Sequence, residues 1–409
     1  MSYDLSAIRS NFPALARTQD GRPVAWLDGP AGTQVPRTVI EATSEVLSAG
    51  VSNHGAEFGA SRYSDEITDG ARAAAADLMG ANPHEIVFGQ NMTSLTFAVS
   101  RAIARDWQPG DRVVVTNLDH DANVTPWRNA AVEKGVEVVF VEFDAATGIL
   151  DPDAVIAAIN ERTRLVAVTA ASNALGSVTD LAPITAEARR VGALSYVDAV
   201  HFSAHRLSNV ATLQPDFLVA SAYKFFGPHT GILYGRSEHL EQLVPYKVEP
   251  SPNTSPDRWE TGTQAFESLV AVTAAVDYLA SLGDGRSRRD RLESGFAAIA
   301  NHEDALSTRF LTRLAEMPGI RVYGPDATGP QRVSTFAVDV AGKSARHVAT
   351  ELGRRGIYVW DGHYYAIGAM DQLGLLESGG LVRIGFVHYT SADEVDRVLD
   401  ALEELAPVL

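Results

Sequence analysis

The chain has 409 residues, and its hydrophobic and charged fractions of 45% and 21% are those of an ordinary globular protein long enough for two domains. Its net charge of −17 argues against nucleic acid or anionic membranes as main partners. It has no cysteine, which excludes disulfides, thiolate metal centres and a thiol nucleophile.

The first residues, Met1 to Leu5, have neither the basic region nor the apolar core of a secretory signal. No apolar stretch approaches the ~20 residues that a membrane span needs. We therefore expect a cytoplasmic protein that has no membrane partner.

Short runs of β-branched residues alternate with helical stretches from residue 86 onward. Strands are predicted at 86–88, 112–115, 136–141, 165–168, 193–197 and 217–220, and a helix from 93 to about 105. Strands separated by helices predict an α/β fold with a mainly parallel sheet. Ligands of such sheets bind outside the carboxyl ends of the strands.

The pattern changes in the last quarter of the chain. A long helix predicted from about 264 to 282 is expected to leave the large domain. Beyond about residue 310, strands are predicted at 321–323 and 333–338, and helices at 344–355 and 393–405. We predict a large domain over 20–290 and a smaller α+β domain made of 1–19 and 291–409.

Lys224 stands out among the four lysines because it lies between aromatic residues, directly after the apolar run 217–220. An amine in dry surroundings has a lowered pKa and becomes a nucleophile toward aldehydes. A lysine that snorkels from a strand end is the alternative, and this segment alone leaves both open.

Polar residues follow the other predicted strands. Met92 and Thr93 open a helix whose amides and hydroxyls could bind a phosphate, although an ordinary capped helix fits this segment equally well. His120 could lie flat against an aromatic ring. These two segments alone do not identify a ligand.

Asp198 follows an apolar run, where an unpaired carboxylate is costly, and it could keep a ring nitrogen protonated. Asn173 and His201 could donate to a phenolic oxygen. Together with Lys224 and the helix start, these groups match the needs of one cofactor, pyridoxal 5′-phosphate (PLP). His201 and His205 are spaced like metal ligands but lack a clear third ligand, so no metal is expected.

The run Asp198 to His201, followed by Ser221 to Lys224, resembles the signature of fold-type I PLP enzymes of the class V aminotransferase, or cysteine desulfurase, family. Four more segments resemble the family in order: 119–127, 172–176, 260–263 and 382–384. The resemblance covers nearly the whole chain. It implies that Ser221 and Tyr223 also bind the cofactor, that Arg383 binds the substrate carboxylate, and that Thr263 reaches the phosphate of the partner subunit in a homodimer.

The main departure from the family lies in the loop 360–366. Tyr365 falls on the sulfur-accepting cysteine of desulfurases, and Trp360 on an arginine that helps bind substrate. Persulfide formation is therefore not expected on this chain. The loop also resembles a cysteine-free subgroup, in which His363 and Tyr365 would face the substrate. His54 could face the substrate too, or cap a turn.

The resemblance implies a PLP-dependent lyase that cleaves the C–S bond of a cysteine S-conjugate by β-elimination, as in lincosamide-type antibiotic biosynthesis. Two alternatives keep the cofactor and change the bond: decarboxylation with oxidative deamination, and epimerisation, each steered by Tyr365 or His363. A third hypothesis is a binding protein that has lost catalysis. The buried lysine and aspartate argue against it.

Overall fold

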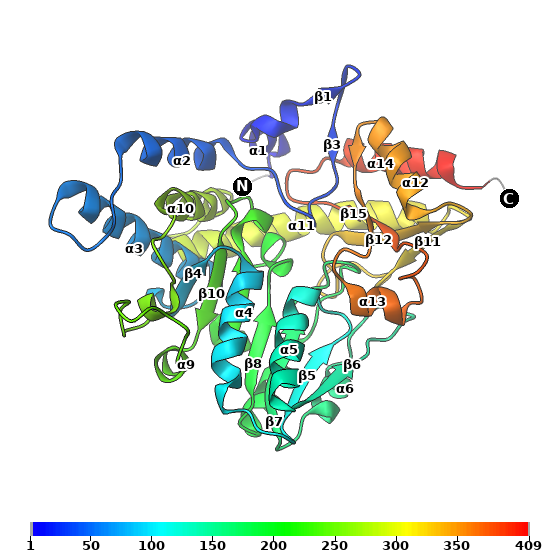
Figure 1. The fold of residues 1–409 in the computed structure, drawn as a ribbon. Coiled ribbons are helices and arrows are strands. Elements are labelled where there is room, and N and C mark those ends of the chain that lie inside the picture. The colour runs from blue at the N-terminus through cyan, green and yellow to red at the C-terminus, as the bar shows by residue number, and fades with distance from the viewer. Residues whose placement is uncertain (1–2, 408–409) are drawn as a thin grey trace.

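The computed structural model describes residues 3–407 and contains a seven-stranded sheet between helices, beside a smaller four-stranded sheet (Figure 1). The strand order of the large sheet is β4-β10-β9-β8-β7-β5-β6. The bounds are β4 Ile86–Gly89, β5 Arg112–Thr116, β6 Glu137–Val141, β7 Thr163–Thr169, β8 Leu194–Asp198, β9 Phe217–Ser221 and β10 Gly231–Gly235. β10 runs in the direction opposite to the other six strands, and it pairs antiparallel with β4 and β9. The predicted mainly parallel α/β fold is confirmed.

The strands of the large sheet are buried on both faces, which explains their nearly continuous apolar runs. In β5, Val113 and Val115 pack on the face covered by α4 (Met92–Ile103) and α5 (Thr125–Lys134). Val114 packs on the opposite face, which also buries residues of several other helices. They include α3 Gly59–Met79, α6 Pro152–Ala158, α7 Leu181–Arg190 and α10 Phe266–Ser281.

A 27-residue helix, α11 (Arg288–Leu314), joins the two cores. Leu292 and Phe296 lie in the core of the large sheet, whereas Leu306 and Phe310 lie in the core of the small one. The expectation that the 264–282 helix leaves the large domain is wrong, because α10 packs against α3 and α2 (Arg37–Ala49).

The small sheet is antiparallel, in the order β11-β12-β15-β14. Its elements are β11 Ile320–Tyr323, β12 Thr335–Val340, β14 Trp360–Gly362, β15 Leu381–Gly385, α12 Ala345–Arg354, α13 Ile367–Gln372 and α14 Ala392–Leu405. Beside it, β3 (Ala25–Trp26) pairs with β13 (Ile357–Tyr358). The remaining short elements are α1 Leu5–Ser10, β1 Thr18–Gln19, β2 Arg22–Pro23, α8 Val210–Leu213 and α9 Ser237–Gln242. The predicted division of the chain into a large and a small domain, with boundaries near residues 20 and 290, stays a prediction.

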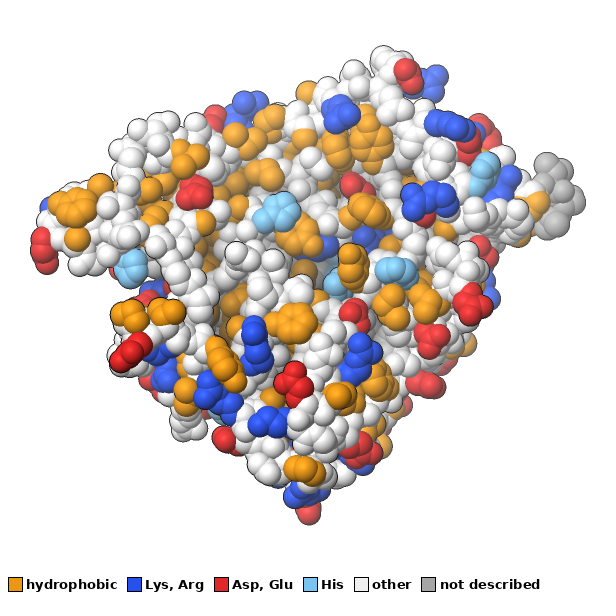
Figure 2. Space-filling model, viewed as in Figure 1, with side chains coloured by type: hydrophobic (Ala, Val, Ile, Leu, Met, Phe, Trp, Pro, Cys, Tyr) orange, Lys and Arg blue, Asp and Glu red, His pale blue; other side chains and the backbone are white. Residues whose placement is uncertain are grey.

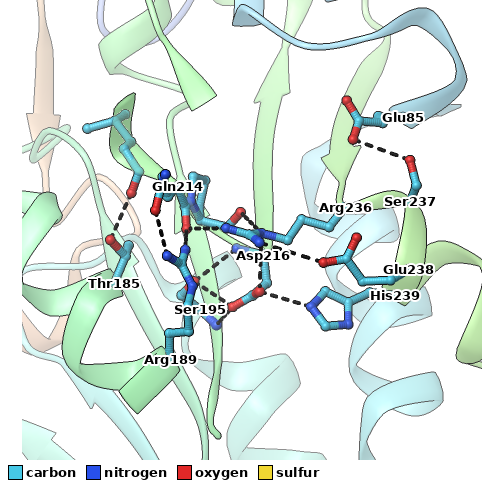
Figure 3. Close-up of polar contacts among 12 residues, drawn as sticks. Glu85, Thr185, Arg189, Ser195, Gln214, Asp216, Arg236, Ser237, Glu238 and His239 are labelled. Carbon is cyan, nitrogen blue, oxygen red and sulfur yellow. Dashed lines mark hydrogen bonds and ion pairs between the residues drawn. The ribbon is translucent and has the colours of Figure 1, made fainter. Parts of the chain in front are cut away.

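Asp216 fastens β8 to β9 at the amino ends of these strands (Figure 3). Its carboxylate accepts two hydrogen bonds of 2.8 Å from the backbone N–H and the hydroxyl of Ser195, and lies 2.9 Å from Nε2 of His239. Burial raises the pKa of Asp216, but the hydrogen bonds with His239 and Ser195 prevail and hold it below its usual value. This network stabilises the sheet at the edge opposite the predicted site.

Within residues 3–407, no helix combines the length and the apolar character that crossing a bilayer requires.

Candidate active site

Two adjoining cavities lie at the carboxyl ends of the parallel strands, where the sequence predicts the site. The larger has a volume of about 910 Å³ and the smaller about 90 Å³. Nine of the predicted cofactor residues line the smaller cavity: Met92, Thr93, His120, Asn173, Asp198, His201, Ser221, Tyr223 and Lys224. The larger cavity adds Arg383, His363 and Tyr365 to its walls. Segments far apart in the sequence therefore meet in one place.

Lys224 lies in the turn after β9, with its amine buried between the two cavities. Nζ donates a hydrogen bond to the backbone carbonyl of Pro30 and lies 4.8 Å from the centre of the Tyr223 ring. Burial, followed by the charge of Arg383, lowers the pKa of Lys224 to about 7. A substantial fraction of this amine is therefore uncharged and nucleophilic at neutral pH.

Asp198 is the last residue of β8 and is buried at the wall of the smaller cavity. Its Oδ1 accepts a 2.8 Å hydrogen bond from the backbone N–H of Val200. Burial raises the pKa of Asp198 to about 6, although that hydrogen bond and the charge of Lys224 lower it. A cationic ring nitrogen against this carboxylate would favour its ionised form.

The loop that carries His120 is held by a chain of buried hydrogen bonds. Asp119 accepts a 2.7 Å bond from the side-chain amide of Asn123 and another from the hydroxyl of Thr116. Asn123 in turn accepts a 3.2 Å bond from the indole N–H of Trp127. The segment 119–127 thus acts as a scaffold for His120, whose own pKa burial lowers to about 4.

His363, Tyr364 and Tyr365 form the outer wall of the larger cavity. Tyr364 and Tyr365 both adopt left-handed backbone conformations, with φ of 54° and 58°. Several hydrogen bonds hold this strained turn. Asp121 N–H donates to the Tyr365 carbonyl over 2.7 Å, the side-chain amide of Asn173 donates to the Tyr364 carbonyl over 2.9 Å, and Tyr365 N–H donates to Nδ1 of His363 over 3.1 Å. The turn directs the exposed Tyr365 ring toward His120.

Arg383, on β15, reaches the cavity from the small sheet and is buried. Its Nη1 donates a 2.9 Å hydrogen bond to the backbone carbonyl of Asn173, and its guanidinium lies 4.5 Å from the Tyr364 ring centre. Burial lowers its pKa only to about 10, so it stays cationic at neutral pH. Arg383 Nε and Asn173 Oδ1 are both buried without a hydrogen-bond partner.

The backbone conformation at position 176 explains why the segment 172–176 ends in a glycine. Its φ of 75° is left-handed, and a Cβ there would lie 2.3 Å from the carbonyl oxygen of Thr335. This close approach brings Thr335 to His201, whose Nε2 lies 2.9 Å from the threonine hydroxyl.

His205, whose ring centroid lies 4.9 Å from that of His201, is paired with Glu303. Its Nδ1 lies 2.7 Å from a carboxylate oxygen of Glu303, and both side chains are fully buried. No group of three potential metal ligands lies together in the part of the chain that the structure describes.

Thr263 and His54 lie outside the two cavities of their own chain. Thr263 is exposed after α9 and lines a separate cavity with Gly89 and His229. His54 lies on the exposed loop after α2, 3.7 Å from Asp65. His54 is not among the residues that line the two cavities, and its role at the substrate stays a prediction.

Several residues of the site have no counterpart in the sequence predictions. Pro30 supplies the acceptor for Lys224, and Asp28 lies partly buried near it. Burial raises the pKa of Asp28 to about 6, while the charges of Arg383 and Lys224 lower it. The acidic, glycine-rich segment 28–32, directly after a short strand, is the sequence feature that could have pointed to these two residues. Phe97, on α4, also lines the larger cavity.

The comparisons with known proteins agree with this geometry. Residues 25–398 match the pattern of Aminotransferase class-V. A cysteine desulfurase of Pectobacterium carotovorum is 31% identical over 100% of both chains, and the aminotransferase-like protein FGM3 of Gibberella zeae is 32% identical over 98% of both. The apo structure of a cysteine desulfurase from Thermococcus onnurineus superposes with a TM-score of 0.88 at 27% identity over 98% of both chains. The cysteine desulfurase CsdA of Escherichia coli gives 0.83 at 27% identity over 99% of both.

Proposed function

Because this chain belongs to the class-V aminotransferase family, whose cysteine desulfurase-like members depend on PLP, we propose that it is a lyase that cleaves the C–S bond of a cysteine S-conjugate by β-elimination. The observation that carries the proposal is Tyr365. It stands where the resemblance expects a sulfur-accepting cysteine, and the chain contains no cysteine at all. Sulfur that leaves on its own substituent needs no such acceptor.

The residues at the smaller cavity fit PLP. A buried amine with a pKa of about 7, a buried carboxylate and the start of α4 face one space. The buried Asn173 Oδ1 without a partner also borders it. We infer that Met92, Thr93, Ser221 and Tyr223 hold the phosphate, and that the other members of the set surround the ring. PLP, when bound, withdraws electrons from Cα of an amino-acid substrate.

Arg383 binds the substrate carboxylate in this proposal. Its Nη1 is fixed by Asn173, which leaves the rest of the guanidinium fork for the substrate. The buried, persistently charged guanidinium also orients Cα toward the neutral amine of Lys224.

Lys224 then accepts the proton of Cα, and the electron pair of that C–H bond expels the sulfur from Cβ as a thiolate. Water hydrolyses the remaining three-carbon enamine to pyruvate and ammonium. Burial lowers the pKa of His120 to about 4, so its imidazole stays neutral. We infer that it packs against the cofactor ring without carrying a charge there.

The size and lining of the larger cavity favour a bulky S-substituent. Its volume of about 910 Å³ lies at the upper end of the range for drug-sized ligands, roughly 300–1,000 Å³. Phe97, Pro126, Trp360 and Tyr365 give it apolar walls. A substrate of this kind suits the assembly of a secondary metabolite, such as a lincosamide-type antibiotic.

The test is incubation of the purified holoenzyme with L- and D-cysteine S-conjugates of increasing size, followed by mass spectrometry. We expect a free thiol and pyruvate in equal amounts from a conjugate with a large apolar substituent. Absence of both products across the panel would refute the elimination. Carbon dioxide release would indicate decarboxylation, and solvent deuterium at Cα without loss of the amine would indicate epimerisation.

We also propose that the enzyme is a homodimer. The exposed positions of Thr263 and His54, outside their own pocket, support this, since a second subunit could bring them to the cofactor of its partner. Sedimentation analysis tests the dimer, and a Thr263→Ala variant should bind PLP more weakly. A monomer with full PLP affinity would contradict it.

A further inference from the structure

A groove of about 280 Å³ runs along the surface between α4 and α5, next to the active-site cavity. Phe97 and Pro126 line both spaces, so the groove continues the cavity. Ser100 and Ala104 are small and buried, and they form its floor. From Phe97 the groove follows α4 to its end at Ile103 and the short turn beyond it, where Arg105 lies, a span of about 12 Å.

The walls of this groove carry an unbalanced positive charge. Arg101, Arg105 and Lys134 line it, and none of them forms an ion pair within residues 3–407. Glu133 is the acidic residue of the lining. Figure 2 shows basic side chains gathered over α4 and α5 on this face. In a chain of net charge −17, such a local excess of cations attracts anions to this place.

The cations are held in position without being neutralised. The Arg105 guanidinium lies 4.4 Å from the ring centre of Tyr246. Lys134 Nζ donates a 2.9 Å hydrogen bond to the backbone carbonyl of Arg105, and Arg101 Nε donates one of 2.9 Å to the carbonyl of Phe97. Each contact leaves N–H groups free for a ligand, and less side-chain freedom is lost when the ligand binds.

We propose that the groove binds an anionic group, a carboxylate or a phosphate, at the far end of the substituent on the substrate's sulfur. The proposal rests on the proposed function for the identity of the near end, the cysteine. The distal anion lies about 6–12 Å beyond the wall formed by Phe97, between Arg101 and Arg105. The substrate is thus an extended S-conjugate with an apolar middle and an acidic end.

Binding of unreactive analogues tests this separately from catalysis. In these analogues a methylene replaces sulfur, and a chain that reaches the groove ends in a carboxylate, a phosphate or an uncharged amide. Calorimetry with the holoenzyme should show that the carboxylate or the phosphate binds about tenfold more tightly than the amide. The preference should weaken as salt is added, because these cations are exposed.

The double variant Arg101→Gln/Arg105→Gln should lose this preference, and the matching thioether substrates should show a raised KM with kcat unchanged. Arg321→Gln is the control, since Arg321 is also exposed and lies 4.3 Å from the ring centre of Tyr323, on the small sheet. It should leave the preference intact.

Equal binding of the charged and uncharged analogues, or a preference that survives the double variant, would overturn the groove proposal. If the preference is found but no conjugate releases a thiol, the groove proposal holds and the proposed reaction fails. If thiol is released while the analogues bind equally, the proposed reaction holds and the groove proposal fails.

Discussion

The imidazole of His120 is stacked on the phenol of Tyr365, with ring centroids 5.4 Å apart and 17° between the planes. Tyr365 therefore covers the histidine that we expect to lie against the cofactor ring. Tyr365, which the family resemblance places on the sulfur-accepting cysteine of desulfurases, packs on His120 at the wall of the larger cavity. The residue lines the larger cavity and is itself 66% exposed.

Replacement of Tyr365 by alanine should raise the pKa of His120. Burial is the main cause that lowers this pKa to about 4, and removal of the ring lets water reach the imidazole. NMR titration of the cofactor-free protein should show the shift toward the ordinary value. Tyr365→Phe keeps the ring and serves as control; an equal shift in both variants would show that the hydroxyl, not the cover, matters.

Capture of PLP by the cofactor-free enzyme should become faster as pH rises through about 7. The neutral amine of Lys224 is the reactive form, and burial lowers its pKa to that value. Stopped-flow absorbance at a series of pH values measures the rate. An inflection near 10, the ordinary lysine value, would contradict the buried environment, and Lys224→Arg should show no covalent capture at any pH.

The same pKa predicts an effect on stability. The amine binds protons less readily in the folded protein than in the unfolded chain, so its burial destabilises the fold below pH 7 and ceases to do so above about 10. Lys224→Met should therefore stabilise the cofactor-free protein by a few kcal/mol at pH 6 and hardly at all at pH 10. Urea denaturation at the two pH values checks this difference.

Nine of the ten residues that we predict to bind the cofactor line the smaller cavity, for a physical reason. Asp198 and Lys224 follow buried strands, and parallel strands bring their carboxyl ends to one edge by geometry alone. Pro30 and Thr335 reach the site through contacts with residues more than a hundred positions away, which no local period encodes.

The fold shows the same division between local and distant signals. The strands 112–116 and 194–198 were predictable because each is a short apolar run with a polar residue at its end. The antiparallel direction of β10 and the reach of α11 into the second core depend on tertiary packing. Local patterns therefore found most elements of the large sheet but not how the chain crosses between the sheets.

Asp198→Asn should lower kcat/KM on the order of a hundredfold or more, since it keeps the hydrogen bond from Val200 but removes the charge that faces the cofactor ring. Asp119→Asn is a matched control. Burial raises the pKa of Asp119 to about 8, so that carboxyl is already largely neutral at pH 7. Comparable losses in the two variants, measured as thiol release, would contradict a special role of the charge at Asp198.

Arg383→Lys should weaken binding of a cysteine conjugate about a hundredfold, because the buried guanidinium fork is replaced by a point charge. The corresponding amine without a carboxylate should bind the variant and the parent equally. Calorimetry with the two ligands isolates the carboxylate contact. A similar loss for both ligands would show that Arg383 supports the cavity wall through Asn173 and Tyr364 instead.

Glu303→Ala should destabilise the protein by about 3–5 kcal/mol, because it leaves His205 buried without its partner. Substitution of both residues, Glu303→Leu with His205→Phe, should recover much of that loss, since an apolar pair needs no hydrogen bonds. The exposed pair of Arg309 and Asp396, at 2.6 Å, is the control, and Arg309→Ala should change the urea midpoint little. If the double variant were no more stable than Glu303→Ala, the loss would come from the space left in the core between α11 and the segment after β8, and not from the unpaired polar group.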